Sequence, residues 1–251
     1  MNWIGLIAGL LIFTTTNAQT IIVGTAPENP PLSFYADNKN HFYGFEVDIM
    51  NEICHRINVT CDYKSVVVSS IEYKLLNNQI DFAIGSIVSP AKPLNGLVFS
   101  LPYLQSNGQF MTLKTSPLNT PQDILNKTIG IRRGALEGGA LLKASIEQLY
   151  NQQVNIIEYP TMNSLLAALS NKKVDVIYSN ELPIRYWYSH HEDVYKLIGN
   201  KIPMGSSYII LAQQKYAELM ESVNRALLDM MADGTYLEIY DRYFSPIQEM
   251  N

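Results

Sequence analysis

Apolar positions along this chain repeat with two different periods, and segments of the two kinds alternate. Phe45, Ile49, Ile53 and Ile57 recur every four residues, which predicts a helix over 45–57. Short apolar runs bounded by polar or turn residues predict strands between such helices. The segments expected to be strands are 21–24, 61–64, 81–84, 128–131, 154–158 and 174–178. This alternation predicts an α/β fold built on mostly parallel sheets flanked by helices.

The segment 59–86 resembles the segment 154–180 in its order of apolar and polar residues. A shift of 94 positions pairs Ser86 with Asn180, and both residues follow predicted strands. Two copies of one strand–helix arrangement predict two similar lobes. Because ligands of open α/β sheets bind beyond the carboxyl ends of strands, and pockets are common between domains, we expect both side chains to face one cleft.

The first 18 residues have the composition of a secretory segment. They carry no charged side chain, and an apolar run over 3–13 is followed by small and polar residues up to Ala18. The run is too short to cross a bilayer, which takes roughly 20 apolar residues. A buried N-terminal helix is the alternative, but no amphipathic segment continues it. The sequence therefore predicts a cleaved signal peptide over 1–18 and a periplasmic protein.

The sequence contains two cysteines, Cys54 and Cys61. The first lies late in the predicted helix and the second opens the next predicted strand. A helix end and the strand after it can bring two Cβ atoms to within about 3.5–4.5 Å, the separation found in disulfides. Two buried thiols are the alternative. An even number of cysteines in an exported chain favours the disulfide.

Composition narrows the function classes. Hydrophobic residues make up 47% of the chain and charged residues 16%, which excludes a disordered protein. The formal net charge of −5 argues against a nucleic-acid partner, because such binding needs a basic surface. The chain lacks the G-x-S-x-G, H-E-x-x-H, P-loop and C-x-x-C motifs. We therefore expect no catalytic residue, no metal site and no cofactor.

Two motifs, GFEVDIMNEIC at 44–54 and ADGTYLEIYDRYF at 232–244, are the most specific of a series that spans nearly the whole chain. In this order they resemble the family 3 extracellular solute-binding proteins, the periplasmic receptors of polar amino-acid ABC transporters. The resemblance implies one lobe from 19–105 plus 205–251 and a second from 106–204. It also implies hinge closure on a small polar solute, and docking of the loaded protein on the membrane permease of an ABC transporter. We expect a monomer.

The resemblance also places candidate ligand residues in the first lobe. They correspond to Asn29 in the first loop and to Gly85, Ser86 and Val88 at a strand end. The arginine that grips the ligand α-carboxylate in the family falls on Pro93. The spacing of the cysteines matches the bridged pair of the lysine/arginine/ornithine- and histidine-binding subgroup, which is the nearest one.

In the second lobe, the aspartate that accepts the ligand ammonium in the family is Asn180, so both halves of the usual zwitterion clamp are altered. Arg132 and Arg133 directly follow a predicted strand, and alternation along the strand lets one of them face the ligand. Arg132 is our candidate for holding an anionic group. Glu137 either contacts the ligand or stabilises the start of the helix that follows it. Two further carboxylates that could receive a cation are Glu28 and Glu181.

Three functions remain open from the sequence. The first is a transport receptor that delivers its solute to a permease. The second is a signalling receptor that presents its loaded form to a membrane sensor. The third is a secreted dehydratase-like enzyme that works through Glu137 or Glu181, because this fold also supports enzymes.

Overall fold

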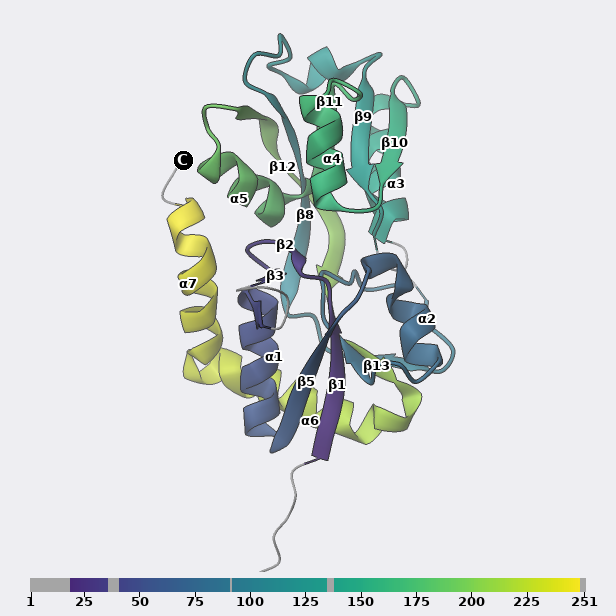
Figure 1. Cartoon of the computed structure of the whole chain (residues 1–251), viewed down its shortest axis with the longest axis vertical. Coiled ribbons are helices and arrows are strands. Elements are labelled where there is room, and N and C mark those ends of the chain that lie inside the picture. Colours follow the sequence, from purple (N-terminus) through teal and green to yellow (C-terminus); the bar gives the residue numbers. More distant parts are fainter. Residues whose placement is uncertain (1–18, 36–40, 91, 135–137, 249–251) are drawn as a thin grey trace, which may run out of the picture.

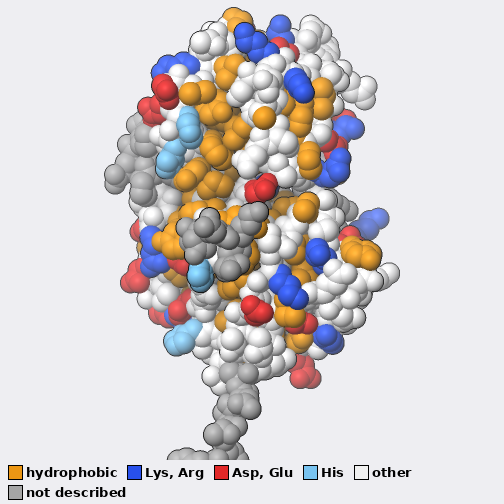
Figure 2. All heavy atoms as spheres, in the orientation of Figure 1, with side chains coloured by type: hydrophobic (Ala, Val, Ile, Leu, Met, Phe, Trp, Pro, Cys, Tyr) orange, Lys and Arg blue, Asp and Glu red, His pale blue; other side chains and the backbone are white. Residues whose placement is uncertain are grey.

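The computed structural model describes residues 19–35, 41–90, 92–134 and 138–248, which form two lobes stacked along the long axis of the molecule (Figure 1). The predicted signal segment, 1–18, lies outside the described residues. Each lobe is built on a five-stranded sheet with helices on both faces. On the face in Figure 2, acidic and basic side chains are interspersed over both lobes.

The first lobe contains the sheet with strand order β5-β1-β6-β13-β7. Successive side chains of a strand point to opposite faces, so Ile21 and Val23 pack in one apolar cluster while Ile22 packs against another. Helices α1, α6 and α7 cover the first face, and α2 covers the second. The elements of this lobe are β1 (Gln19–Thr25), α1 (Phe45–Arg56), β5 (Val59–Ser65), α2 (Ile71–Leu76), β6 (Phe82–Ala83), β7 (Leu97–Phe99), β13 (Leu211–Gln213), α6 (Ala217–Asp233) and α7 (Thr235–Gln248).

The second lobe contains the sheet with strand order β10-β9-β11-β8-β12. Helix α3 covers one face, and α4 covers the other together with part of α5. The elements of this lobe are β8 (Leu104–Leu113), β9 (Thr128–Arg132), α3 (Gly138–Tyr150), β10 (Asn155–Tyr159), α4 (Met162–Ser170), β11 (Val176–Asn180), α5 (Glu181–His190) and β12 (Tyr195–Tyr208).

The sheets confirm the predicted α/β class. In each sheet one described strand runs against the other four, β13 in the first lobe and β8 in the second. A smaller sheet joins β2 (Glu28–Asn29), β3 (Ser33–Tyr35) and β4 (Phe42–Tyr43) above the start of α1. It carries Asn29 toward the boundary between the lobes.

The chain passes between the lobes through two paired strands. Strands β8 and β12 pair antiparallel from Leu104 opposite Tyr208 to Leu113 opposite Tyr195. The pairing continues into the first lobe, where the amide of Ser100 donates to the carbonyl of Ile210 at 2.9 Å. The two crossovers between the lobes, formed by β8 and β12, are therefore hydrogen-bonded to each other.

Helix α5 connects the lobes through its side chains. Its Ile184 packs in the core of the second lobe, while Leu182 and Tyr186 pack against the apolar cluster of the first lobe. The hydrophobic pattern does not predict this helix, because its sequence, ELPIRYWYSH, contains a proline and clustered aromatic residues. Among the described residues, none of the helices is both long and apolar enough to span a membrane.

The disulfide prediction is confirmed. Cys54 in the last turn of α1 is bonded to Cys61 in β5, with Cα atoms 6.2 Å apart. The alternative of two buried thiols is therefore wrong. The bridge fixes the lower end of α1 to the edge strand of the first sheet.

Candidate functional site

The candidate site lies where the strand ends of the two lobes face each other. Arg132 ends β9 and Asn180 ends β11 in the second lobe, while Asn29 ends β2 and Ser86 follows β6 in the first. All four side chains are buried although all are polar. Because buried polar groups need hydrogen-bond partners, their contacts indicate how the site works.

A chain of hydrogen bonds crosses from the second lobe to the first. The Nη1 group of Arg132 donates to Oδ1 of Asn29 at 2.9 Å. The side-chain amide of Asn29 donates to Oγ of Ser86 at 2.8 Å. These two hydrogen bonds join Arg132, Asn29 and Ser86, three residues that the sequence predicts separately as ligand residues.

This chain of hydrogen bonds, the relay, ends at Glu46, in the first turn of α1. Its Oε1 accepts hydrogen bonds from the backbone N–H of Ser86 at 2.6 Å, from the Ser86 hydroxyl at 3.2 Å and from the Tyr103 hydroxyl at 2.7 Å. Its Oε2 is buried and has no hydrogen-bond partner among the described residues. Burial raises the pKa of Glu46, and the bonds from Tyr103 and Ser86 and the charge of Arg132 oppose that rise.

The guanidinium of Arg132 is available for an anion. The residue is 6% exposed, and burial lowers its pKa. In the part of the chain that the structure describes, its side chain makes one hydrogen bond, to Asn29, and no ion pair. A guanidinium has five N–H donors and can hold a carboxylate with two parallel bonds. Arg132 therefore has donors to spare for an anionic group.

Arg133 points the other way. Its side chain is 55% exposed, and its Nε lies 3.6 Å from Oε2 of Glu158. This is the alternation expected along a strand. Of the two arginines, Arg132 is the one that faces the boundary between the lobes.

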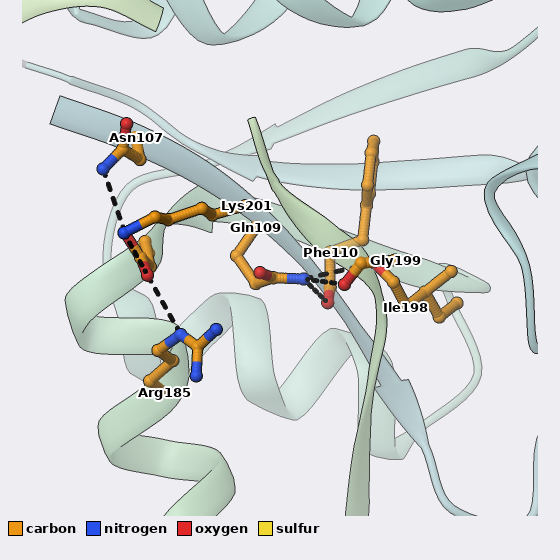
Figure 3. A network of polar contacts seen from close by, with 8 residues as sticks. Asn107, Gln109, Phe110, Arg185, Ile198, Gly199 and Lys201 are labelled. Carbon is orange, nitrogen blue, oxygen red and sulfur yellow. Dashed lines mark hydrogen bonds and ion pairs between the residues drawn. The ribbon is translucent and has the colours of Figure 1, made fainter. Parts of the chain in front are cut away.

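Asn180 and Glu181 are held by the crossovers. The amide of Asn180 donates to Oγ of Ser106 at 3.1 Å. The carboxylate of Glu181 accepts from Asn107 at 3.0 Å and from Arg185 at 3.0 Å, and lies 3.6 Å from Nζ of Lys201 (Figure 3). Two cations already compensate Glu181, so its contacts assign it to fixing α5 against β8 and β12.

The same crossovers are joined by Gln109 of β8, whose amide nitrogen lies 3.1 Å from the carbonyls of Ile198 and Gly199 (Figure 3). Next to these carbonyls, between Ile198 and Ile202, the pairing of β12 with β8 shifts register. The side chain of Gln109 supplies a donor to the two carbonyls.

The remaining candidates have different surroundings. Gly85 is buried beside Ala26, and a Cβ built on it would lie 3.5 Å from the Ala26 nitrogen. The side chain of Val88 packs in the apolar cluster of the first lobe, so a ligand could reach only its backbone. Glu137 lies outside the described residues.

A cavity of about 310 Å³ lies beside Arg132 between the lobes. Its lining includes Arg132 at the end of β9 and residues that follow β1, β5 and β10, as expected for strand ends that face each other. Glu28, Lys74 and Thr161 contribute polar groups to it. Its volume is at the lower end of the range for small-molecule sites.

A larger groove of about 1140 Å³ lies at the crossovers and is lined by Glu181, Arg185, Tyr236 and Tyr240. Its lining does not include Arg132, Asn29 or Asn180, and its carboxylate, Glu181, already has partners. We therefore assign the candidate ligand site to the smaller cavity.

The sequence does not identify Glu46 as a site residue. The motif that contains it, GFEVDIMNEIC, indicates only the family resemblance, and an acidic residue in the first turn of a helix is usually a solvated partner of the helix dipole. The sequence signal that could identify it is its position between two apolar residues, Phe45 and Val47. Both of these neighbours are buried in the structure.

The amino-acid sequence of this chain matches a family model and is similar to several known proteins. Residues 21–246 match the sequence model of the bacterial extracellular solute-binding proteins, family 3. An arginine-binding periplasmic protein from Mannheimia haemolytica is 28% identical over 235 residues, which cover 91% of this chain and 92% of that protein. The lysine/arginine/ornithine-binding periplasmic protein of Escherichia coli strain K12 is 23% identical, with 90% of this chain and 88% of that protein covered.

The fold of this chain is also similar to that of a solved structure. The crystal structure of an arginine 3rd transport system periplasmic binding protein from Legionella pneumophila superposes with a TM-score of 0.82 at 32% identity. The match covers 90% of this chain and 100% of that one.

Proposed function

Because this chain belongs to the bacterial extracellular solute-binding proteins of family 3, a family of binding proteins rather than enzymes, we propose that it captures an amino acid in the cavity beside Arg132. The carboxylate of the ligand binds the Arg132 guanidinium. The loaded protein then delivers the amino acid to the membrane permease of an ABC transporter, from the periplasm.

The observation that carries the proposal is the state of Arg132. A buried cation that makes no ion pair is unfavourable, and a ligand carboxylate in contact with it offsets the cost of its burial. The family position for a carboxylate-binding arginine holds Pro93, so the first lobe offers no guanidinium at that place. Arg132 supplies the missing charge from the second lobe.

Glu28 is our candidate for the ligand ammonium. It lines the same cavity as Arg132, and its charge acts on the Arg132 guanidinium. Asn180 carries no charge and donates its amide to Ser106, so it replaces only part of what an aspartate does. A zwitterion that spans Arg132 and Glu28 would contact both lobes.

L-Arginine is the first ligand to test, since the similar proteins reported above are named for binding arginine, or lysine, arginine and ornithine. The matched control is agmatine, which has the guanidinium and the chain of arginine but no carboxylate. L-Lysine, L-histidine and L-glutamine complete the series. Calorimetric titration and thermal shift should be recorded for each.

We expect L-arginine or another amino acid of the series to raise the melting temperature, by a change equivalent to about 2.7 kcal/mol at 100 times its Kd. Agmatine should produce no comparable shift. Equal binding of agmatine and L-arginine would contradict the carboxylate contact, and the absence of binding by every amino acid would contradict the proposed function.

A further inference from the structure

Resting on the proposed function, we infer that Glu46 is a positioning residue of the ligand site, which orients Asn29 so that its carbonyl oxygen, and not its amide, faces Arg132. Glu46 lies in the first lobe, and the relay through Ser86 and Asn29 connects it to the guanidinium in the second. None of its atoms needs to touch the ligand.

The direction of each hydrogen bond follows from the acceptor at the end of the relay. Oε1 of Glu46 accepts from the backbone N–H of Ser86 and is also the acceptor for its hydroxyl proton. The Ser86 oxygen is then left with lone pairs toward Asn29, so the side chain of Asn29 presents its NH₂ group to it. The Asn29 oxygen is thereby turned to Arg132.

The opposite orientation of Asn29 is unfavourable. It would place the NH₂ donors of Asn29 against the N–H donors of Arg132, in a site where both residues are buried. Buried donors without acceptors are costly. The relay therefore holds Arg132 toward the cavity in one arrangement.

Glu46 also stabilises the backbone at Ser86. Ser86 has φ of 55°, in the left-handed region that a non-glycine residue rarely adopts. Its N–H lies 2.6 Å from Oε1 of Glu46, so the same carboxyl oxygen holds both the backbone and the side chain. Such backbone strain persists when surrounding contacts determine it.

The relay gives Ser86 a supporting role instead of the direct ligand contact expected from the sequence. Its N–H and its hydroxyl proton are both directed to Glu46, so neither donor is left for a ligand carboxylate. Ser86 is then a part of the support for Arg132 rather than a direct ligand donor.

The test compares Glu46→Gln with Glu46→Leu, two neutral replacements of similar size. Glutamine keeps an acceptor oxygen where Oε1 stands, and leucine does not. We expect Glu46→Gln to bind L-arginine within about threefold of the wild-type Kd, and Glu46→Leu to bind at least tenfold more weakly. Tyr103→Phe removes one donor to the same oxygen but leaves Ser86 in place, and should bind like the wild type.

A double-mutant cycle separates positioning from general destabilisation. In an Arg132→Met background, Glu46→Leu should cause no further loss of affinity. Equal weakening by Glu46→Gln and Glu46→Leu, or the same fold loss with and without Arg132, would overturn the inference.

Ligand-free crystals of the two Glu46 variants keep this test independent of the proposed function. The 2.9 Å contact from Arg132 to Asn29 should persist in Glu46→Gln and be lost in Glu46→Leu. If the wild type binds no amino acid, the proposed function fails while this comparison still decides the relay. Contacts retained in both variants would refute it.

Discussion

Arg132 donates a hydrogen bond to Asn29 across the boundary between the lobes, although 103 residues separate them in the sequence. The donor ends a strand of the second sheet, and the acceptor ends a strand of the small sheet in the first lobe. This single contact joins the two strand-end regions at the cavity. It is also the contact that a ligand carboxylate would share.

Replacing each of the two arginines singly by methionine tests which of them binds the ligand. Arg132→Met should weaken L-arginine binding by about 2–5 kcal/mol, the loss typical when a charged partner of a buried contact is removed. Arg133→Met should leave the Kd unchanged, because that side chain is 55% exposed and lies beside Glu158. Calorimetric titration measures both. Weak binding by Arg133→Met with normal binding by Arg132→Met would reverse the assignment.

Asn29→Asp should also reduce binding. The new carboxylate would pair with Arg132 and compete with the ligand carboxylate for its N–H donors. We expect the Kd for L-arginine to rise about tenfold or more, corresponding to at least ~1.4 kcal/mol. Asn163→Asp makes the same change of charge at an exposed position of α4 and serves as control. An unchanged or lower Kd in Asn29→Asp would count against the carboxylate contact.

The raised pKa of Glu46 predicts a pH-dependent stability difference. A carboxyl whose pKa is raised on folding stabilises the protein below its unfolded pKa, and that contribution is lost as pH rises through the folded pKa. Relative to the wild type, Glu46→Gln should therefore gain stability as pH rises above about 4.5, the ordinary pKa of the group. The neighbours that bear on this titration are Ser86, Tyr103 and Arg132.

The pKa of Asp233 is shifted in the opposite direction, so its contribution to stability should change with pH in the opposite sense to that of Glu46. The hydrogen bond from Arg56 lowers the pKa of Asp233 to about 2. Its contribution is present above its ordinary pKa and is lost as pH falls toward 2, so Asp233→Asn should destabilise the protein at neutral pH and less so in acid. Melting temperatures between pH 3 and 8 would show the two trends. Parallel curves for Glu46→Gln and the wild type would contradict the Glu46 prediction.

The disulfide should stabilise the first lobe without affecting the ligand. Replacing Cys54 and Cys61 by alanine should lower the free energy of unfolding by about 2–3 kcal/mol, the contribution expected for a short closed loop. The Kd for L-arginine should not change, because Cys54 is in the last turn of α1 and Glu46 is in the first. Urea titration and thiol counting on the denatured protein test this. Two reactive thiols in unreduced protein would be inconsistent with the bridge.

The sequence predicted the α/β class because most elements carry a clear period. The four-residue repeat from Phe45 to Ile57 corresponds to α1, and the apolar run at 128–131 lies within β9. Helix α5 was missed, since its periodicity is interrupted by Pro183 and by residues that pack on both lobes. Local pattern does not show a helix shared between two cores.

The candidate site was predictable in part. Strand alternation requires Arg132 and Arg133 to diverge, but it does not say which one faces the other lobe. The link between Arg132 and Asn29, and the role of Glu46, depend on contacts between segments far apart in the chain. Those contacts are set by the packing of whole lobes, which no local pattern encodes.

The position of the ligand carboxylate decides whether Arg132 is the binding residue. A crystal structure of the protein with L-arginine, or with whichever amino acid of the series binds best, measures this directly. We predict two roughly parallel hydrogen bonds of about 2.7–2.9 Å from the Arg132 guanidinium to the two carboxylate oxygens. A bound amino acid whose carboxylate is held elsewhere, with Arg132 still donating only to Asn29, would contradict the account.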